Sequence, residues 1–167
     1  KNIHNNRLQV INQYEVAGIT DGGTAKYSNR YDVTVLVNGL PLVHIELKRR
    51  GVDIREAFNQ INRYQRHSFG ADSGLFKYVQ LFLISNSTLT KYYSNTTRER
   101  HINETTSTKA VKRKTSNSYE FTSWWADAAN RPIQDLRAFT KTFFAKHTIL
   151  NILTKYCVLT ADKTLLV

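Results

Sequence analysis

Two carboxylates and an ammonium group stand close to two short apolar runs in the first third of the chain. Asp32 precedes a run rich in valine, and Glu46, Leu47 and Lys48 end the next run. Carboxylate oxygens are hard ligands that suit Mg²⁺, which usually takes one or two of them together with waters and substrate phosphate. We therefore expect Asp32, Glu46 and the backbone carbonyl of Leu47 to hold Mg²⁺. With Lys48 beside them, the group suits phosphodiester hydrolysis, in which a divalent cation neutralises charge and activates water.

The stretch from Tyr31 to Lys48 is typical of a β-hairpin, because Asn38-Gly39 is a strong turn pair between two β-forming runs. Side chains alternate between the faces of a strand. The odd positions are apolar and are expected in the core: Val33, Val35, Val37, Val43, Ile45 and Leu47. The even positions share the opposite face and include Asp32, Thr34, His44, Glu46 and Lys48.

The length of the turn decides whether the two carboxylates meet. A two-residue turn pairs Val37 with Leu40 and sets Asp32 opposite Ile45, which mixes polar and apolar side chains on one face. A three-residue loop with a left-handed glycine pairs Val37 with Pro41 and sets Asp32 opposite Glu46. We predict the three-residue loop. Facing carboxylates repel each other, so a cation must lie between them, either Lys48 or a divalent metal.

The composition limits the class of protein. The chain has 167 residues, enough for one domain, and 24 lysines and arginines against 13 acidic residues give a net charge of +11. This excess favours a polyanion such as nucleic acid or an acidic membrane surface, although it also suits a surface kept basic for solubility. A single cysteine fits a reducing cytoplasm, and no apolar segment is long enough to span a membrane. Because methionine is absent, we expect a fragment of a longer protein.

The order of the expected elements indicates an α/β fold. We expect a strand at 8–16, a loop at 17–29, the hairpin, a helix from Asp53 to about His67, and strands at 76–85 and 88–94. Asp53 is expected to cap the helix, with Glu56 three residues later. A helix between strands suggests a crossover, and hence a mixed central β-sheet flanked by helices.

The expected helix carries both a packed stripe and polar residues. Its stripe is formed by Ile54, Ala57, Phe58, Ile61 and Tyr64. Gln60 and Tyr64 lie one turn apart on neighbouring parts of one face, although a tyrosine on such a stripe is more often a core residue. Five arginines near this helix are expected to contact DNA phosphates, with a solvated basic turn as the alternative for the first two: Arg49, Arg50, Arg55, Arg63 and Arg66.

The second half of the chain is less informative. Residues 95–118 are polar and basic and are expected to form a long surface loop. Residues 119–125 are aromatic and are expected to dock on the sheet edge. Pro132 suits the first turn of a helix whose stripe is Ile133, Leu136, Phe139 and Phe143. A further helix or turn is expected at 148–156, and strands at 157–160 and 165–167.

These residues resemble a known superfamily. Asp32, the Glu46-Leu47-Lys48 triplet and the following helix resemble the PD-(D/E)xK nuclease core, and Gln60-Ile-Asn-Arg-Tyr64 matches the Gln-x-x-x-Tyr motif of its RecB-like branch. More closely, residues 29–51 and 56–64 resemble the restriction (R) subunit of type I restriction-modification enzymes. The resemblance is dense over 29–66, and residues 163–167 resemble the entry to that subunit's motor.

The resemblance implies a restriction-endonuclease-like core and a type I site-specific deoxyribonuclease acting on double-stranded DNA. Asp32 and Glu46 would hold Mg²⁺, Lys48 would be the catalytic lysine, and Gln60 and Tyr64 would brace the site and contact DNA. The subunit of this family is also an ATP-driven DNA translocase that works with modification (methyltransferase) and specificity subunits. No Gly-x-x-x-x-Gly-Lys-[Ser/Thr] motif occurs here, so residues 1–167 are expected to be a single nuclease domain with the ATP-binding motor beyond 167.

Two alternatives remain open from the sequence. The chain could be another PD-(D/E)xK nuclease, such as a repair or recombination enzyme, or a non-catalytic nucleic-acid-binding domain whose ion pairs are structural. The family core often begins with a helix that carries a further acidic residue, and such a helix would precede Lys1.

Overall fold

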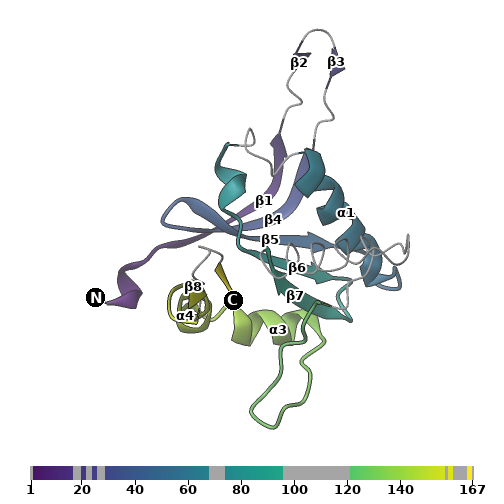
Figure 1. Cartoon of the computed structure of the whole chain (residues 1–167). Coiled ribbons are helices and arrows are strands. Elements are labelled where there is room, and N and C mark those ends of the chain that lie inside the picture. The colour runs from purple at the N-terminus through teal and green to yellow at the C-terminus, as the bar shows by residue number, and fades with distance from the viewer. Residues whose placement is uncertain are drawn as a thin grey trace, which may run out of the picture.

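A five-stranded mixed sheet with helices on both faces forms the centre of the molecule (Figure 1). The computed structural model describes residues 2–16, 20–21, 24–25, 29–67, 74–95, 121–156, 158–159 and 165–166. The strands of the main sheet are β1 (Leu8–Val16), β4 (Asn29–Val37), β5 (Leu40–Leu47), β6 (Leu81–Ser85) and β7 (Thr90–Ser94). The other elements are η1 (Ile3–Asn5), β2 (Thr20–Asp21), β3 (Thr24–Ala25), α1 (Ile54–His67), η2 (Gly74–Tyr78), α3 (Leu136–Phe143), α4 (Lys146–Thr154), β8 (Val158–Leu159) and β9 (Leu165–Leu166).

The strand order is β1-β4-β5-β6-β7, and only β5 and β6 run parallel to each other. Parallel neighbours need a crossover connection, and α1 provides it on one face of the sheet. The predicted α/β class, with a mixed sheet flanked by helices, is confirmed. Among the described residues, no helix is both long and apolar enough to cross a membrane.

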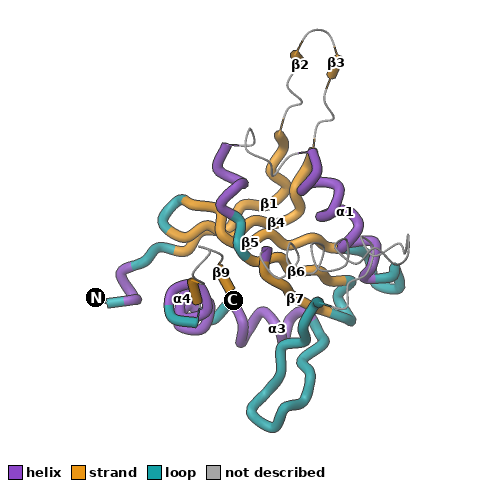
Figure 2. Tube along the Cα trace, in the orientation of Figure 1, coloured by secondary structure: helices purple, strands orange, loops and turns teal. Residues whose placement is uncertain are grey.

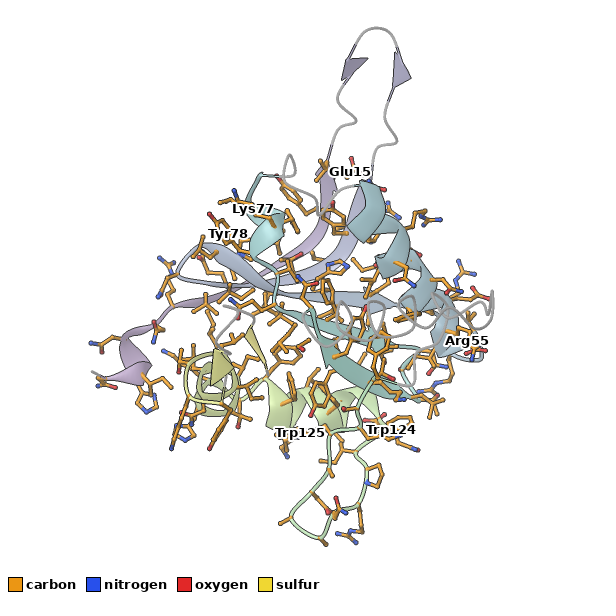
Figure 3. The ribbon with its side chains drawn as sticks, in the orientation of Figure 1. Glu15, Arg55, Lys77, Tyr78, Trp124 and Trp125 are labelled. Atoms are coloured by element: carbon orange, nitrogen blue, oxygen red, sulfur yellow. The ribbon has the colours of Figure 1, made fainter. Side chains whose placement is uncertain are left out.

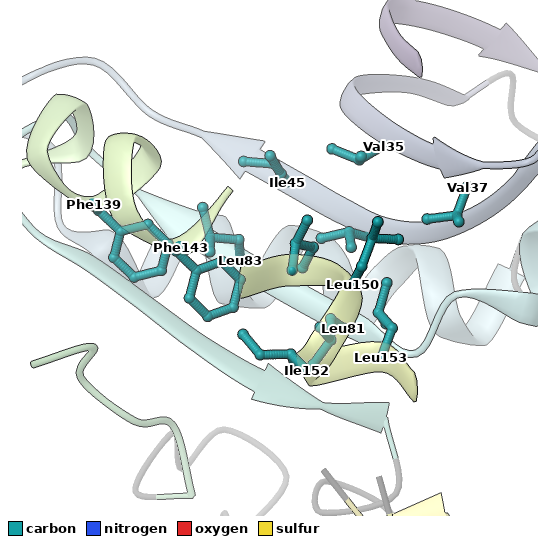
Figure 4. Packing of buried hydrophobic residues seen from close by; sticks show 12 residues of the cluster. Val35, Val37, Ile45, Leu81, Leu83, Phe139, Phe143, Leu150, Ile152 and Leu153 are labelled. Atoms are coloured by element: carbon teal, nitrogen blue, oxygen red, sulfur yellow. The ribbon is translucent and has the colours of Figure 1, made fainter. Parts of the chain in front are cut away.

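The two faces of the sheet bury different kinds of side chain. On one face, α3 and α4 pack aromatic and aliphatic residues against the odd positions of the hairpin (Figure 4). Val35, Val37, Val43 and Ile45 are buried there, as the alternation predicts. On the other face α1 covers the even positions with its predicted stripe, in which all five members are buried.

The turn of the hairpin differs from the prediction, but the register near the carboxylates does not. Asn38 and Gly39 both have positive φ, at 52° and 85°, and form a two-residue turn that pairs Val37 with Leu40. The three-residue loop is therefore wrong. The register then shifts between Leu36↔Pro41 and Val35↔Val43, so the extra residue lies inside β5.

A bulge at this point has a physical reason. Pro41 has no N–H to give to the strand ladder, and prolines within sheets are confined to edges, strand starts and bulges. The shift leaves Val33 opposite Ile45. Continuing that register by one residue sets Asp32 opposite Glu46, which is the arrangement that the alternation requires.

Several element boundaries also differ from the prediction. The expected strand at 76–85 begins with a 3-10 helix, η2, and only its second half is strand. Pro132 does not start a helix: it pairs with Ala126 in an isolated bridge, and α3 begins at Leu136 after the Asp135 cap. The loop expected at 17–29 contains the short strands β2 and β3 (Figure 2).

Other expectations are confirmed in their described parts. The strand 8–16 is β1, β7 covers most of 88–94, and α4 covers most of 148–156. Ser123 exchanges two backbone hydrogen bonds with Tyr92, at 3.0 and 2.8 Å, so the aromatic segment docks on the β7 edge as predicted. Strands β8 and β9 pair near the end of the chain. Most of the basic segment 95–118, Cys157 and Thr160 lie outside the described residues.

We expect Thr34→Val to stabilise the fold by about 1 kcal/mol, because the Thr34 hydroxyl is fully buried and lacks a hydrogen-bond partner among the described residues. Valine keeps the shape and removes the cost of desolvating that hydroxyl. Thr90→Val is the matched control, since the equally buried Thr90 hydroxyl lies 2.9 Å from that of Ser85. Urea denaturation of both variants measures the two changes, and equal effects would contradict the assignment.

Candidate active site

The two predicted carboxylates meet at the end of β5. The backbone N–H of Leu47 donates to Oδ2 of Asp32 at 2.9 Å, which fixes the Asp32 carboxylate beside the strand that carries Glu46. Asp32 is half-buried, whereas Glu46 has no exposed surface. The bulge in β5 and the alternation of side chains therefore bring together two acids that are distant in the sequence.

Burial strongly perturbs Glu46. It raises the pKa of the Glu46 carboxyl from 4.5 to about 8, and the neighbouring Asp32 charge acts in the same direction, while Lys48 opposes both. An acid in this position binds a proton at neutral pH unless a cation takes its place. Strongly shifted carboxyl groups of this kind are typical of functional sites.

Lys48 extends to Glu46 and to the helix above the sheet. Its ammonium lies 3.3 Å from Oε1 of Glu46 and donates a hydrogen bond to Oε1 of Gln60. The Lys48 side chain is 20% exposed and the Glu46 side chain is fully buried, so the ammonium stands between the carboxylate and solvent. A lysine held from two sides has little freedom to turn away from the site.

Gln60 and Tyr64 continue the contact from Lys48 along α1. The Gln60 amide donates to the Tyr64 hydroxyl at 2.5 Å, and that hydroxyl donates to the carbonyl of Arg30 at 2.9 Å. Burial raises the pKa of the Tyr64 hydroxyl, which keeps it protonated and able to donate. One turn of helix thus links the lysine to the strand that carries Asp32.

The helix holds these groups in place through its cap and its packing, both of which the sequence encodes. Oδ1 of Asp53 accepts from the N–H of Arg55 at 2.9 Å, so Asp53 caps α1 as predicted. The buried stripe presses α1 against the sheet, and it leaves Gln60 half-buried at the site.

Two features of the site do not follow from the sequence patterns alone. His44 was expected on the polar face without a role, yet its Nε2 lies 3.4 Å from Oε2 of Glu46, and burial lowers the His44 pKa to about 3. The alternation of side chains already indicated the first contact, because it set His44 and Glu46 on one face. Nothing in the sequence indicated a role for the Arg30 carbonyl, since every residue has a backbone carbonyl.

The donor set fits a hard divalent cation. Oε2 of Glu46 is buried without a hydrogen-bond partner among the described residues, and Asp32 supplies a second carboxylate beside it. In the described part of the chain, no three His, Cys, Asp or Glu side chains gather into a metal-binding group. A site with two carboxylates suits Mg²⁺, which keeps several waters and phosphate oxygens in its shell.

Four of the five predicted DNA-binding arginines are exposed on the surface. Arg49 and Arg50 are exposed after β5, and Arg55 and Arg63 are exposed on α1. Figure 3 shows Arg55 on the outer side of the helix. The Arg63 guanidinium lies 5.9 Å from the centre of the Tyr64 ring. The side chain of Arg66 lies outside the described residues.

A separate cavity of about 530 Å³ lies between β7 and α4. Its walls include Tyr92, Phe121, Trp125 and Tyr156, and none of the predicted site residues lines it. The carboxylates instead lie where β4 and β5 meet the middle of α1, outside this cavity.

Comparison with known proteins identifies a family for the first part of the chain. Residues 1–101 match the family described as the N terminus of the type I restriction enzyme R protein. These residues contain Asp32, Glu46, Lys48, Gln60 and Tyr64.

Three curated relatives match along most of the chain. The EcoprrI type I restriction enzyme endonuclease subunit of Escherichia coli is 52% identical over 167 residues, which are 100% of this chain and 46% of that protein. The SsaAORF53P endonuclease subunit of Staphylococcus saprophyticus is 40% identical over 96% of this chain and 14% of that protein. The SauCOLORF180P endonuclease subunit of Staphylococcus aureus is 38% identical over 92% of this chain and 14% of that protein.

The chain therefore spans less than half the length of these relatives. The family match covers more than half of the chain and includes the whole carboxylate–lysine–helix arrangement. On this basis, the chain belongs to the family of type I restriction enzyme R protein N-terminal regions.

Proposed function

We propose that the chain is the Mg²⁺-dependent endonuclease domain of a type I restriction enzyme R subunit, cutting phosphodiester bonds of double-stranded DNA. The observation that carries the proposal is the connected set of contacts from Asp32 and Glu46 through Lys48 to Gln60 and Tyr64. Family membership supports the same activity, because the relatives are named endonuclease subunits.

Each residue has a defined part in this reaction. Asp32, Glu46 and the carbonyl of Leu47 would hold Mg²⁺, which when bound supplies charge neutralisation and a more acidic water. Lys48 would orient the attacking water or stabilise the charge that develops on the phosphate oxygens. Gln60 positions the ammonium, and Tyr64 connects that arrangement to the backbone of β4.

The charge of the chain supports DNA as the partner. The net charge of +11 attracts a polyanion, and Arg49, Arg50, Arg55 and Arg63 are exposed to solvent. These arginines would hold the phosphate backbone without reading its sequence, because phosphate contacts position a protein on DNA and base contacts specify.

The rest of the enzyme would supply the remaining functions. The longer relatives leave room for an ATP-driven motor outside these residues, and their names describe subunits of an enzyme. We propose that modification and specificity subunits are the partners in the cytoplasm, and that ATP serves only the full-length subunit.

Asp32→Ala and Lys48→Ala should each lower DNA cleavage by the assembled complex at least about a hundredfold, because each removes a group that acts on the transition-state charge. DNA binding and ATP hydrolysis should persist. A supercoiled-plasmid nicking assay with Mg²⁺ and ATP measures the cleavage. Lys141→Ala is the control, since Lys141 is an exposed lysine on α3, on the opposite face of the sheet. Normal cutting by both site variants would refute the assignment.

The stability of the metal-free protein should fall between pH 6.5 and 8. In this window Glu46 is protonated in the folded chain, with a pKa near 8, and ionised in the unfolded chain, with a pKa near 4.5. The folded state binds more protons, so unfolding becomes easier as the pH rises, by up to about 1.4 kcal/mol per pH unit. The stability that protonated Glu46 adds to the folded state is fully present below pH 4.5 and is lost as the pH rises through 8.

Urea denaturation in EDTA, compared between wild type and Glu46→Gln, isolates this effect. The window begins at 6.5 because buried His44, whose pKa falls from 6.5 to about 3, gives a slope of opposite sign at lower pH. The glutamine variant should lack the decline. Equal slopes for the two proteins would show that Glu46 is already ionised in the folded state.

Arg49→Ala combined with Arg50→Ala should weaken DNA binding equally on unrelated sequences. The slope of log affinity against log salt should become shallower by about 0.9 for each DNA phosphate that the variant no longer neutralises. Fluorescence anisotropy on two duplexes over a range of salt measures both quantities. A weakening confined to one duplex would indicate base recognition by these arginines instead.

A further inference from the structure

His44 lies two residues before Glu46 on the same face of β5, and both side chains are fully buried. Its Nε2 is 3.4 Å from Oε2 of Glu46. That oxygen is the one that lacks a hydrogen-bond partner in the described part of the chain, while Oε1 faces the Lys48 ammonium at 3.3 Å. The two oxygens of Glu46 are therefore approached by two different groups.

The His44 ring is held by aromatic neighbours. Tyr31, Tyr64 and Phe82 meet it edge-on, with ring centroids 5.5, 5.9 and 6.4 Å away and interplanar angles of 76°, 78° and 73°. An apolar side chain of similar size would fill this space without burying polar nitrogens. Burying an imidazole here is therefore best explained by an interaction that its ring nitrogens make with a polar group.

Tyr64 joins the two sides of the arrangement. Its ring contacts His44, and its hydroxyl ends the chain of hydrogen bonds that begins at Lys48. Both oxygens of Glu46 are thus tied, through His44 or through Lys48 and Gln60, to the same tyrosine.

We propose that His44 is a positioning residue whose Nε2–H donates to Oε2 of ionised Glu46 and holds that carboxylate ready for a divalent cation. This inference rests on the proposed metal-dependent function. An ionised carboxylate can only accept hydrogen bonds, so the proton of the pair must then lie on His44. Groups that hydrogen-bond metal ligands in this way orient them, and their loss usually weakens metal binding about 10- to 100-fold.

Calorimetric titration of the metal-free chain with Mn²⁺ tests the proposal. His44→Leu and His44→Phe remove the donor, and both should bind Mn²⁺ about 10- to 100-fold more weakly than wild type. His44→Gln keeps an N–H donor and should recover most of the affinity. Thr34→Val, a buried change at the residue paired with His44 across the hairpin, should leave the affinity unchanged.

Denaturation in EDTA separates positioning from packing. If His44 only fills the core, its variants lower the metal-free stability while those that fold bind Mn²⁺ as wild type does, and the proposal is overturned. Equal loss of affinity in the apolar and glutamine variants also overturns it, because shape rather than the donor would then matter. Two apolar variants are used so that the failure of one to fold leaves the comparison intact.

Asp32→Ala shows whether the titration reports this site, since it should abolish the Mn²⁺ signal. If wild type itself binds no Mn²⁺, the proposed metal site fails, and the role of His44 fails with it. If wild type binds Mn²⁺ and the His44 variants bind equally well, only the role of His44 fails. The two proposals are therefore distinguishable in one set of measurements.

Discussion

Glu46 is a carboxyl group without exposed surface, placed next to a second carboxylate. Ionising it there costs free energy, and the surrounding structure has to offset that cost. An unpaired charge in such a place is expensive, and proteins avoid it by protonation, by pairing or by coordination of a metal. Lys48 provides part of the pairing, and Gln60 and Tyr64 keep Lys48 in position. The raised pKa of Glu46 shows that Lys48 alone does not compensate the cost.

The register of the hairpin makes this arrangement possible. A regular two-residue turn continued without interruption would have turned Glu46 away from Asp32. The shift inside β5, beside Pro41, restores the pairing before the strand reaches the carboxylates. The turn and the bulge therefore have separate causes. Asn38-Gly39 favours a two-residue turn, and the bulge gives the shifted register that sets Asp32 opposite Glu46.

Much of this architecture could be predicted from the residues. Alternation along the hairpin identified the buried valines and the polar face, and helical spacing identified the α1 stripe, because each pattern has one strong periodicity. The same patterns placed Asp32, Glu46 and Lys48 on one face, whereas the site roles of Gln60 and Tyr64 came from the resemblance to a known family. The position of the bulge could not be predicted, since the same final register arises from a longer turn or from an extra residue within a strand.

Other errors arose where tertiary contacts outweigh local preference. Pro132 is compatible with a first helical turn, but it pairs with Ala126 in the segment that docks on β7, and Asp135 provides the better cap.

The two faces of the sheet bury different kinds of side chain, and this difference explains how the fold tolerates such a site. The face toward α3 and α4 is packed with aliphatic and aromatic side chains and contains no carboxylate among its buried members in the described part of the chain. The face toward α1 contains Glu46, His44 and Thr34, groups that are costly to bury. Because apolar burial supplies most of the free energy of folding, the first face can maintain the sheet. The second face is then free to hold polar groups in the geometry that the proposed metal site requires.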